Sequence, residues 1–200
     1  MKERPYFMVW LLSILLYFLS KSQTDTFSEL LNIYDETLIP CGTTNMSSGS
    51  WDSEGKCSEL GGGVHQICIE NISKKTPNFS QKTGQSNWSD QRGNNNHCVC
   101  LGAWSLYQRK NPQSRQDKVL KCEAIPKVAL TTQYVSKFGQ GWNKWNGLEL
   151  PDQIKDGVES LVENCYNEKE DKSQKLQKNY CDFAREVEVL RKGDLYEKLC

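Results

Sequence analysis

The stretch PDQIKDGVESLVENC, residues 151–165, decides the fold of the C-terminal part of the chain. Apolar side chains recur in it at the spacing of one helix face, at Ile154, Val158, Leu161, Val162 and Cys165. Pro151 is acceptable at a helix start, and the acidic Asp152 suits the positive end of the helix dipole. The pattern predicts a helix that begins near Pro151 and ends near Cys165.

A second apolar stripe follows, formed by Leu176, Tyr180, Phe183, Val187 and Leu190, and it ends at Gly193. Residues 167–177 between the stripes are almost devoid of apolar side chains, which indicates a connector. Two helices joined in this way fold back antiparallel. Residues 148–200 are therefore predicted to form a helical hairpin tail.

The hairpin predicts one disulfide. Cys165 closes the first stripe and Cys181 lies in the second, so the turn between them is expected to bring both toward the closed end of the hairpin. A Cys165–Cys181 bond closing a loop of about 16 residues contributes roughly 3 kcal/mol in the chain-entropy model. Cys200 is then expected to reach back to Cys122 or to remain the odd thiol.

Residues 23–147 are predicted to form a cysteine-rich α+β domain. Short strand-like runs occur at 64–70 (VHQICIE), 97–104 (HCVCLGAW) and 118–124 (KVLKCEA). Residues 42–63 indicate a loop held by Cys41 and Cys57, and residues 72–96 a long polar loop. The fold class predicted is α+β: a small disulfide-stapled antiparallel or mixed sheet with loops, followed by the C-terminal helical hairpin.

The N-terminus has the pattern of a secretory signal peptide. Lys2 and Arg4 precede an apolar run of 14 residues, 6–19, which ends in the small residues around Ser22. As a helix this run is about 21 Å long, shorter than the roughly 30 Å hydrocarbon core of a bilayer. Residues 1–22 are predicted to be removed; an uncleaved signal anchor is the alternative.

Nine cysteines follow the predicted cleavage point: Cys41, Cys57, Cys68, Cys98, Cys100, Cys122, Cys165, Cys181 and Cys200. In an oxidising compartment cysteines persist as disulfides. Because nine is odd, at least one cysteine is expected to be unpaired or intermolecular. Spacing alone leaves the remaining connectivity open.

Four N-x-S/T sequons lie at Asn45, Asn71, Asn78 and Asn87. Such sites must lie on exposed loops to be used. Three of them flank or occupy the polar loop 72–96, whereas Asn45 lies four residues from Cys41. We expect Asn71, Asn78 and Asn87 to carry glycans in preference to Asn45.

The composition excludes several classes of protein. Lys+Arg and Asp+Glu both number 25, and removing residues 1–22 leaves 22 basic and 24 acidic residues. This balance gives no electrostatic reason to expect a nucleic-acid partner. With 37% hydrophobic residues, the chain is too polar to span a membrane repeatedly. No stable membrane span is expected after signal cleavage.

Residues 32–138 carry motifs that resemble a known family. Leu38-Ile39-Pro40-Cys41, Gly63-Val64-His65-Gln66-Ile67-Cys68, Cys98-Val99-Cys100 followed by Trp104, and Val119-Leu120-Lys121-Cys122-Glu123-Ala124 match its spacing. The family is a domain of unknown function (DUF2237-like). The chain departs from it at Cys57, where the family has a double cysteine, and at His97, where it has Trp. The resemblance implies a compact α+β fold and no particular chemistry.

Few residues suggest chemistry. Five soft donors could surround a Zn²⁺ ion, namely His65, Cys68, His97, Cys98 and Cys100, but disulfides compete for the same sulfurs and the spacing is not that of a zinc finger. No catalytic residue and no cofactor are predicted. Four acidic residues, Asp152, Asp156, Glu159 and Glu163, are expected to form a solvated helix face.

Trp142 and Trp145 are the binding candidates, because exposed aromatic side chains stack on sugar rings and anchor protein partners. Packing in the core is the alternative for both. The function predicted is a secreted or lumenal, disulfide-stabilised glycoprotein module that binds an unknown protein or glycan, or acts structurally. The alternatives are an enzyme using His65 and His97 with the Cys98-x-Cys100 cluster, or a signal-anchored subunit of a membrane complex.

Overall fold

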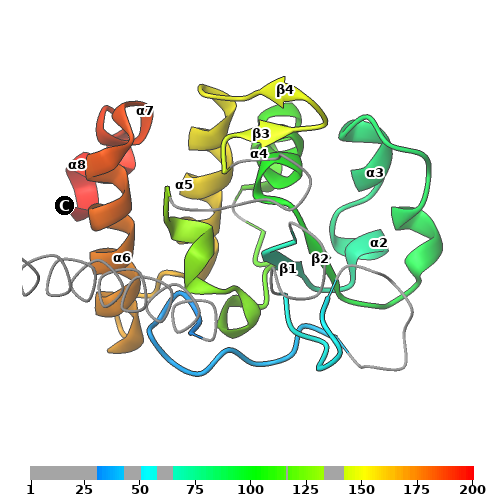
Figure 1. Ribbon diagram of the computed structural model, residues 1–200, viewed down its shortest axis with the longest axis horizontal. Coiled ribbons are helices and arrows are strands. Elements are labelled where there is room, and N and C mark those ends of the chain that lie inside the picture. Colours follow the sequence, from blue (N-terminus) through cyan, green and yellow to red (C-terminus); the bar gives the residue numbers. More distant parts are fainter. Residues whose placement is uncertain (1–30, 43–50, 58–64, 116, 133–141) are drawn as a thin grey trace, which may run out of the picture.

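The protein is described from a computed structural model (Figure 1). It describes residues 31–42, 51–57, 65–115, 117–132 and 142–200. The predicted signal peptide, residues 1–22, and the sequon at Asn45 lie outside the described residues.

The described chain has a mixed α+β fold with two small antiparallel sheets and a helical C-terminal region. The strands are β1 (Ile67–Ile69), β2 (His97–Val99), β3 (Lys144–Trp145) and β4 (Leu148–Glu149), with β1 paired to β2 and β3 to β4. The α-helices are α2 (Ile72–Lys75), α3 (Phe79–Lys82), α4 (Leu101–Lys110), α5 (Gln153–Cys165), α6 (Lys172–Glu186), α7 (Glu188–Arg191) and α8 (Asp194–Leu199). The 3-10 helices are η2 (Ser89–Arg92), η3 (Pro112–Ser114), η4 (Cys122–Ala124) and η5 (Lys127–Leu130).

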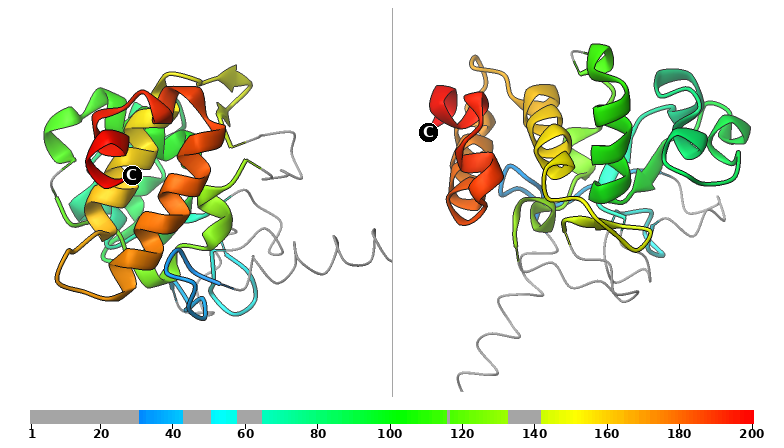
Figure 2. Two further views of the ribbon diagram at one scale, coloured as in Figure 1. Left: turned by 90° about the vertical axis from the view of Figure 1, so that its left-hand side faces the viewer. Right: turned by 90° about the horizontal axis from the view of Figure 1, so that it is seen from above.

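Helices α4, α5 and α6 stand side by side, with α5 in the middle (Figures 1 and 2). The predicted helix at 151–165 is confirmed as α5, and Ile154, Val158 and Leu161 of its stripe are fully buried. Because α5 has a neighbour on each side, its environment is more enclosed than that of a tail helix. The buried apolar residues form one continuous hydrophobic core, whose first member in the sequence is Ile33 and whose last is Leu199.

Helices α4 and α5 approach each other closely at Gly157. A Cβ placed on Gly157 would overlap the Ser105 hydroxyl and lie 2.8 Å from the Cα of Ser105. The indole Nε1 of the fully buried Trp104 donates to the Gly157 carbonyl at 3.1 Å. A residue without a side chain is therefore required at this crossing, although glycine is a poor helix former.

The predicted strand at 97–104 is wrong beyond Val99. The Trp104 N–H donates to the Cys100 carbonyl at 2.9 Å, so the chain enters α4 directly after β2. The predicted strand at 118–124 is also wrong: Leu120 forms one isolated bridge with Ile69, and η4 follows. Apolar residues in a run of this length fit a buried helix as well as a strand, which is why the pattern misled.

The predicted long loop 72–96 contains α2, α3 and η2. A buried polar contact joins two parts of this segment: the Ser80 and Ser89 hydroxyls lie 3.0 Å apart, and both residues are fully buried. Phe79 is fully buried, and its ring packs at a tilt against Tyr107 of α4, with 5.1 Å between the ring centroids. Hydrophobic periodicity could not reveal a segment held by hydroxyl pairs and single aromatic anchors.

Residues 144–149 form the β3–β4 hairpin, whose turn is made by an Asn-Gly pair. Asn146 and Gly147 both have positive φ, 50° and 78°, which is the backbone of a type I′ turn. Asparagine and glycine are the residues that tolerate this conformation, so the local sequence alone favours this hairpin turn.

Four disulfides join the described cysteines: Cys41–Cys68, Cys57–Cys98, Cys122–Cys165 and Cys181–Cys200. The predicted Cys165–Cys181 bond is therefore wrong, and so is the predicted pairing of Cys200 with Cys122. Cys181 lies nine residues beyond the start of α6 at Lys172, about 14 Å along the helix axis and far from the closed end of the hairpin. Cys165, at the end of α5, instead meets η4.

No helix among the described residues is long and apolar enough to cross a membrane. The longest is α6, with 15 residues. At about 1.5 Å per residue it would cover roughly 22 Å, less than the hydrocarbon core of a bilayer.

Candidate functional site

Two disulfides lie against each other beside the β1–β2 ladder. The register places Cys68 directly opposite Cys98, and each is bonded to a cysteine of the 41–57 segment. The sulfur atoms of Cys41, Cys57 and Cys98 all lie within 4.8 Å of one another. We call the four residues Cys41, Cys57, Cys68 and Cys98 the sulfur cluster.

The two histidines lie near the sulfur cluster. His97 is 5% exposed, and its ring packs against Trp88 at 4.5 Å and against Trp51 at 6.2 Å between centroids. Burial lowers the pKa of His97 to about 3, with smaller contributions from Arg92 and His65. Burial also lowers the pKa of His65. Both imidazoles are therefore neutral at physiological pH.

The five soft donors considered as a zinc site are not available together. Cys68 and Cys98 are bonded to other cysteines, so neither has a thiolate to offer a metal in this oxidised state. Cys100, which forms none of the four disulfides, is buried at the start of α4. The structure does bring His65 and His97 into electrostatic range of each other.

The two tryptophans considered as binding residues have packing roles. Trp145 is buried, and its Nε1 donates to the Thr83 carbonyl at 2.9 Å. Trp142 is half-buried and packs edge-on against Phe183 at 5.7 Å. Trp145 is thus unavailable as an exposed contact, and Trp142 is partly covered by its contact with Phe183 of α6.

Two of the sequons present exposed asparagines. Asn78 and Asn87 are exposed, whereas Asn71 is half-buried. The serines of these two sequons, Ser80 and Ser89, are the buried hydroxyl pair described above. These serines therefore have a structural role whether or not their asparagines carry glycans.

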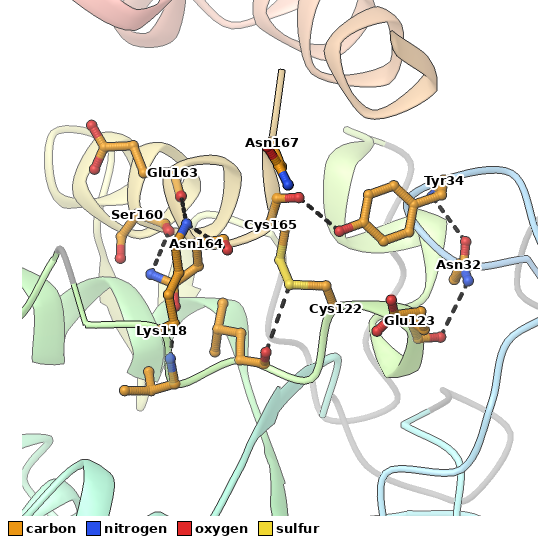
Figure 3. Close-up of a disulfide and its surroundings, with 12 residues drawn as sticks. Asn32, Tyr34, Lys118, Cys122, Glu123, Ser160, Glu163, Asn164, Cys165 and Asn167 are labelled. Atoms are coloured by element: carbon orange, nitrogen blue, oxygen red, sulfur yellow. Dashed lines mark hydrogen bonds between the residues drawn. A yellow bond between two sulfur atoms is a disulfide. The ribbon is translucent and has the colours of Figure 1, made fainter. Parts of the chain in front are cut away.

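The Cys122–Cys165 disulfide fixes the C-terminal end of α5 (Figure 3). Beside it, the Lys118 ammonium donates to the carbonyls of Glu163 at 2.6 Å and Asn164 at 2.9 Å. The last carbonyls of a helix have no hydrogen-bond partner within the helix and carry the negative end of its dipole. The Lys118 ammonium supplies both a donor for these carbonyls and a positive charge beside the dipole.

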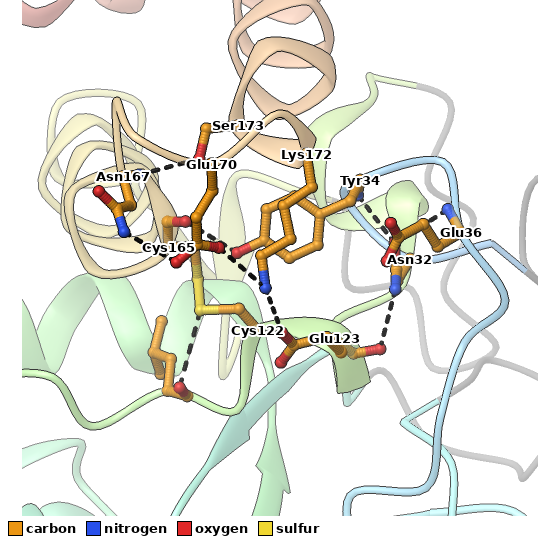
Figure 4. Close-up of polar contacts among 11 residues, drawn as sticks. Asn32, Tyr34, Glu36, Cys122, Glu123, Cys165, Asn167, Glu170, Lys172 and Ser173 are labelled. Carbon is orange, nitrogen blue, oxygen red and sulfur yellow. Dashed lines mark hydrogen bonds and ion pairs between the residues drawn. A yellow bond between two sulfur atoms is a disulfide. The ribbon is translucent and has the colours of Figure 1, made fainter.

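Lys172 holds the start of α6 to the same place (Figure 4). Its ammonium lies 2.6 Å from a Glu123 carboxylate oxygen, 3.2 Å from a Glu170 oxygen and 5.0 Å from the ring centroid of Tyr34. The hydrogen bond from Lys172 lowers the pKa of Glu123. The Tyr34 hydroxyl donates to the Cys165 carbonyl at 2.8 Å, and burial raises the pKa of that phenol. This arrangement is a structural clamp around the end of α5.

A cavity of about 600 Å³ lies between α5, the connector after it, and α8; we call it the α5–α8 pocket. Its lining carries both charges: Arg115, Lys169 and Lys198 are basic, and Glu159, Glu163, Glu168 and Asp194 are acidic. Val162, Tyr166, Asn167, Leu195 and Leu199 complete the lining. The clamp at Cys165 determines where the connector residue Tyr166 stands, and so shapes one wall of the pocket.

Glu159 is the buried charge of this pocket. Its side chain is 8% exposed and lies 4.0 Å from Arg115 and 3.8 Å from Lys155, while Arg115 pairs more closely with Asp156. Burial raises the pKa of the Glu159 carboxyl, with Lys155 and Arg115 acting in the opposite direction. Oε1 of Glu159 and Nε of Arg115 are buried and make no hydrogen bond with the described residues.

The sequence pattern missed this site. Asp156 and Glu159 were expected on a solvated face, but both are buried, whereas Asp152 and Glu163 are exposed. Gly193 is the one residue whose identity reflects the site, because a Cβ at that position would overlap Oε1 of Glu159. The sequence alone does not show that Gly193 lies beside α5, so this glycine could not have revealed the site.

No protein-family model, curated protein or solved structure matches the chain. The chemistry of the site therefore follows from its geometry alone. Glu159, an acceptor, and Arg115, a donor, both line this polar cavity, which suits a ligand that can both donate and accept hydrogen bonds.

Proposed function

We propose that the protein is a secreted or lumenal N-glycosylated binding module, and that its ligand site is the α5–α8 pocket. The observation that carries this proposal is the pair of buried polar atoms, Oε1 of Glu159 and Nε of Arg115, that lack hydrogen bonds among the described residues. Oε1 of Glu159 lies 3.8 Å from the Lys155 ammonium, which is an ion pair beyond hydrogen-bond distance, so a ligand that reaches these atoms and hydrogen-bonds to both gains free energy on binding.

The ligand class is a glycan. A sugar hydroxyl donates one hydrogen bond and accepts others, which matches a carboxylate acceptor next to a guanidinium donor. The half-buried Tyr166 adds an aromatic ring to the lining, and aromatic rings pack well against the apolar faces of sugars. The volume of about 600 Å³ falls within the range of small-molecule sites.

An enzyme using His65 and His97 is the weaker alternative. A general acid or base acts best when its pKa lies near the working pH, whereas burial lowers the pKa of His97 to about 3. Neither histidine lines the α5–α8 pocket. The geometry therefore favours binding over catalysis.

Residues 32–138 are proposed to be a diverged member of the domain-of-unknown-function family that they resemble. Motif residues Cys41, Cys68, Cys98, Trp104 and Ala124 are all at most 1% exposed. Motif positions that meet in one core are what a shared fold requires, and this supports the assignment.

Glu159→Gln should weaken glycan binding at least about tenfold, because hydrogen bonds to charged groups contribute roughly 1.5–3 kcal/mol. Binding of the mature protein to a panel of immobilised glycans is the measurement. Glu188→Gln is the matched control, since Glu188 is exposed and pairs only with Lys192 among the described contacts. Absence of any glycan binding, or equal binding by both variants, would contradict the proposal.

Secretion from a eukaryotic host should yield a chain that begins near Gln23, carries glycans at Asn78 and Asn87, and gains two hydrogens per disulfide on reduction. Intact mass before and after glycosidase and reductant measures all three. Asn78→Gln and Asn87→Gln are the appropriate sequon variants, because Ser80→Ala or Ser89→Ala would also break the buried hydroxyl pair. Recovery of chains that keep Met1, or a mass unchanged by glycosidase, would refute this part of the proposal.

A further inference from the structure

The sulfur cluster brings four buried sulfurs together from two parts of the chain. Cys68 and Cys98 face each other across the β1–β2 ladder, and the disulfides join them to Cys41 and Cys57 of the described stretches 41–42 and 51–57. These two stretches are joined by the Cys41 N–H, which donates to the Gly55 carbonyl at 2.8 Å. All four residues are at most 1% exposed. The Asn96 side chain, next to β2, also donates from Nδ2 to the Cys41 carbonyl at 2.8 Å, so a contact other than a disulfide holds Cys41 beside the ladder.

We propose that the sulfur cluster binds one Zn²⁺ ion when its two disulfides are reduced. Zn–S bonds of about 2.3 Å place the sulfurs of a tetrahedral four-cysteine site about 3.8 Å apart. Three of the four sulfurs already lie within 4.8 Å of one another, and the fourth, of Cys68, is bonded to one of the three. The disulfide arrangement therefore already gathers the four sulfurs near the spacing that the metal site requires.

A cavity lies beside the sulfur cluster at Cys41. A cavity of about 490 Å³ is lined by Cys41 together with Pro40, Trp51, Asn96 and Lys121, among others. The Lys121 ammonium donates to the Pro40 carbonyl at 2.6 Å, which places a positive charge at the rim. A four-thiolate zinc site carries a net charge of about −2, so a neighbouring cation favours it.

The reaction requires two equivalents of a dithiol reductant. A thiolate of the first dithiol attacks the Cys41 sulfur and releases the Cys68 thiolate, and its second thiol then releases Cys41 as the dithiol becomes a cyclic disulfide. The Cys41 sulfur lies within 4.8 Å of both sulfurs of the other bond, so it can relay the second reduction to Cys57–Cys98. Each disulfide gains two electrons and two protons, and binding of Zn²⁺ releases the four thiol protons.

The test reduces the mature protein with dithiothreitol under nitrogen, in the presence of Zn²⁺, and measures bound zinc after desalting. We expect about one zinc per chain. The Cys181→Ser/Cys200→Ser variant, which lacks a disulfide outside the cluster, should bind the same amount. The Cys41→Ser/Cys68→Ser variant should bind none. Equal zinc in both variants, or no zinc in the wild type, would overturn the proposal.

A second measurement covers the case in which the cluster variant fails to fold. Co²⁺ bound to the reduced wild type should give the charge-transfer and ligand-field absorption of four-sulfur coordination. The same spectrum in His97→Gln would exclude that histidine as a ligand. A spectrum with fewer sulfur ligands, or one that changes in His97→Gln, would contradict a four-cysteine site.

Discussion

Acidification from pH 7 to pH 4 should destabilise the protein by about 3 kcal/mol through His97 alone, and the His97→Gln variant should lack this loss. The pKa of His97 is lowered by burial to about 3, from 6.5 in the unfolded chain. Below pH 6.5 the unfolded state takes up a proton that the folded state does not. Stability is therefore fully present above pH 6.5 and is lost as the pH falls toward 3.

Urea unfolding of the wild type and His97→Gln at both pH values measures the effect. Carboxylates also titrate over this interval, but their contribution is common to both proteins and cancels in the difference. His65→Gln serves as a control for removing an imidazole beside His97. A pH-dependent difference below about 1 kcal/mol would show that His97 is hydrated or rearranged in solution.

Replacing Cys122 and Cys165 together with alanine should lower the free energy of unfolding by about 4 kcal/mol. In the chain-entropy model, the bond closing this 43-residue separation contributes about that amount. The bond also fixes the end of α5, where Lys118 and Tyr34 find their partners. The loss of stability is therefore expected to extend beyond η4, to residues 31–42, which contain Tyr34, and to α6.

Cys181→Ala/Cys200→Ala is the matched comparison. Its bond spans 19 residues and joins α6 to the chain end, so about 3 kcal/mol is expected. Denaturant unfolding gives both values, and hydrogen exchange locates the loosened segments. A smaller loss for the Cys122/Cys165 variant than for this one would mean that the clamp residues hold α5 without the disulfide.

The sequence predicted best where local rules decide the structure. The stripe of α5 is periodic, and the Asn146-Gly147 turn requires residues that tolerate positive φ. β1 lies inside the predicted strand-like run 64–70. Each of these features can be recognised within about a dozen residues, so no knowledge of the tertiary fold was needed.

The sequence predicted poorly where distant segments meet. Several cysteines lie at sequence separations that a disulfide to Cys165 could span, and the observed bond to Cys122 forms because η4 lies at the end of α5. Glu159 is a buried carboxylate where Gly193, just before α8, and Arg115, far away in the sequence, approach α5. The helices within 72–96 rest on single anchors such as Phe79, which leave no periodic pattern. The pocket and the sulfur cluster both belong to this class.

The connectivity of the four disulfides has a consequence for biosynthesis. The pairs Cys41–Cys68 and Cys57–Cys98 interleave along the chain, whereas Cys122–Cys165 and Cys181–Cys200 follow one another. If the chain is translocated N-terminus first, as the proposed secretion requires, Cys41 and Cys57 meet oxidant before either native partner has emerged. The first bond available in that order is the non-native one between Cys41 and Cys57, and its formation would make the N-terminal half depend on disulfide isomerisation. Each later pair can close as soon as its second cysteine arrives.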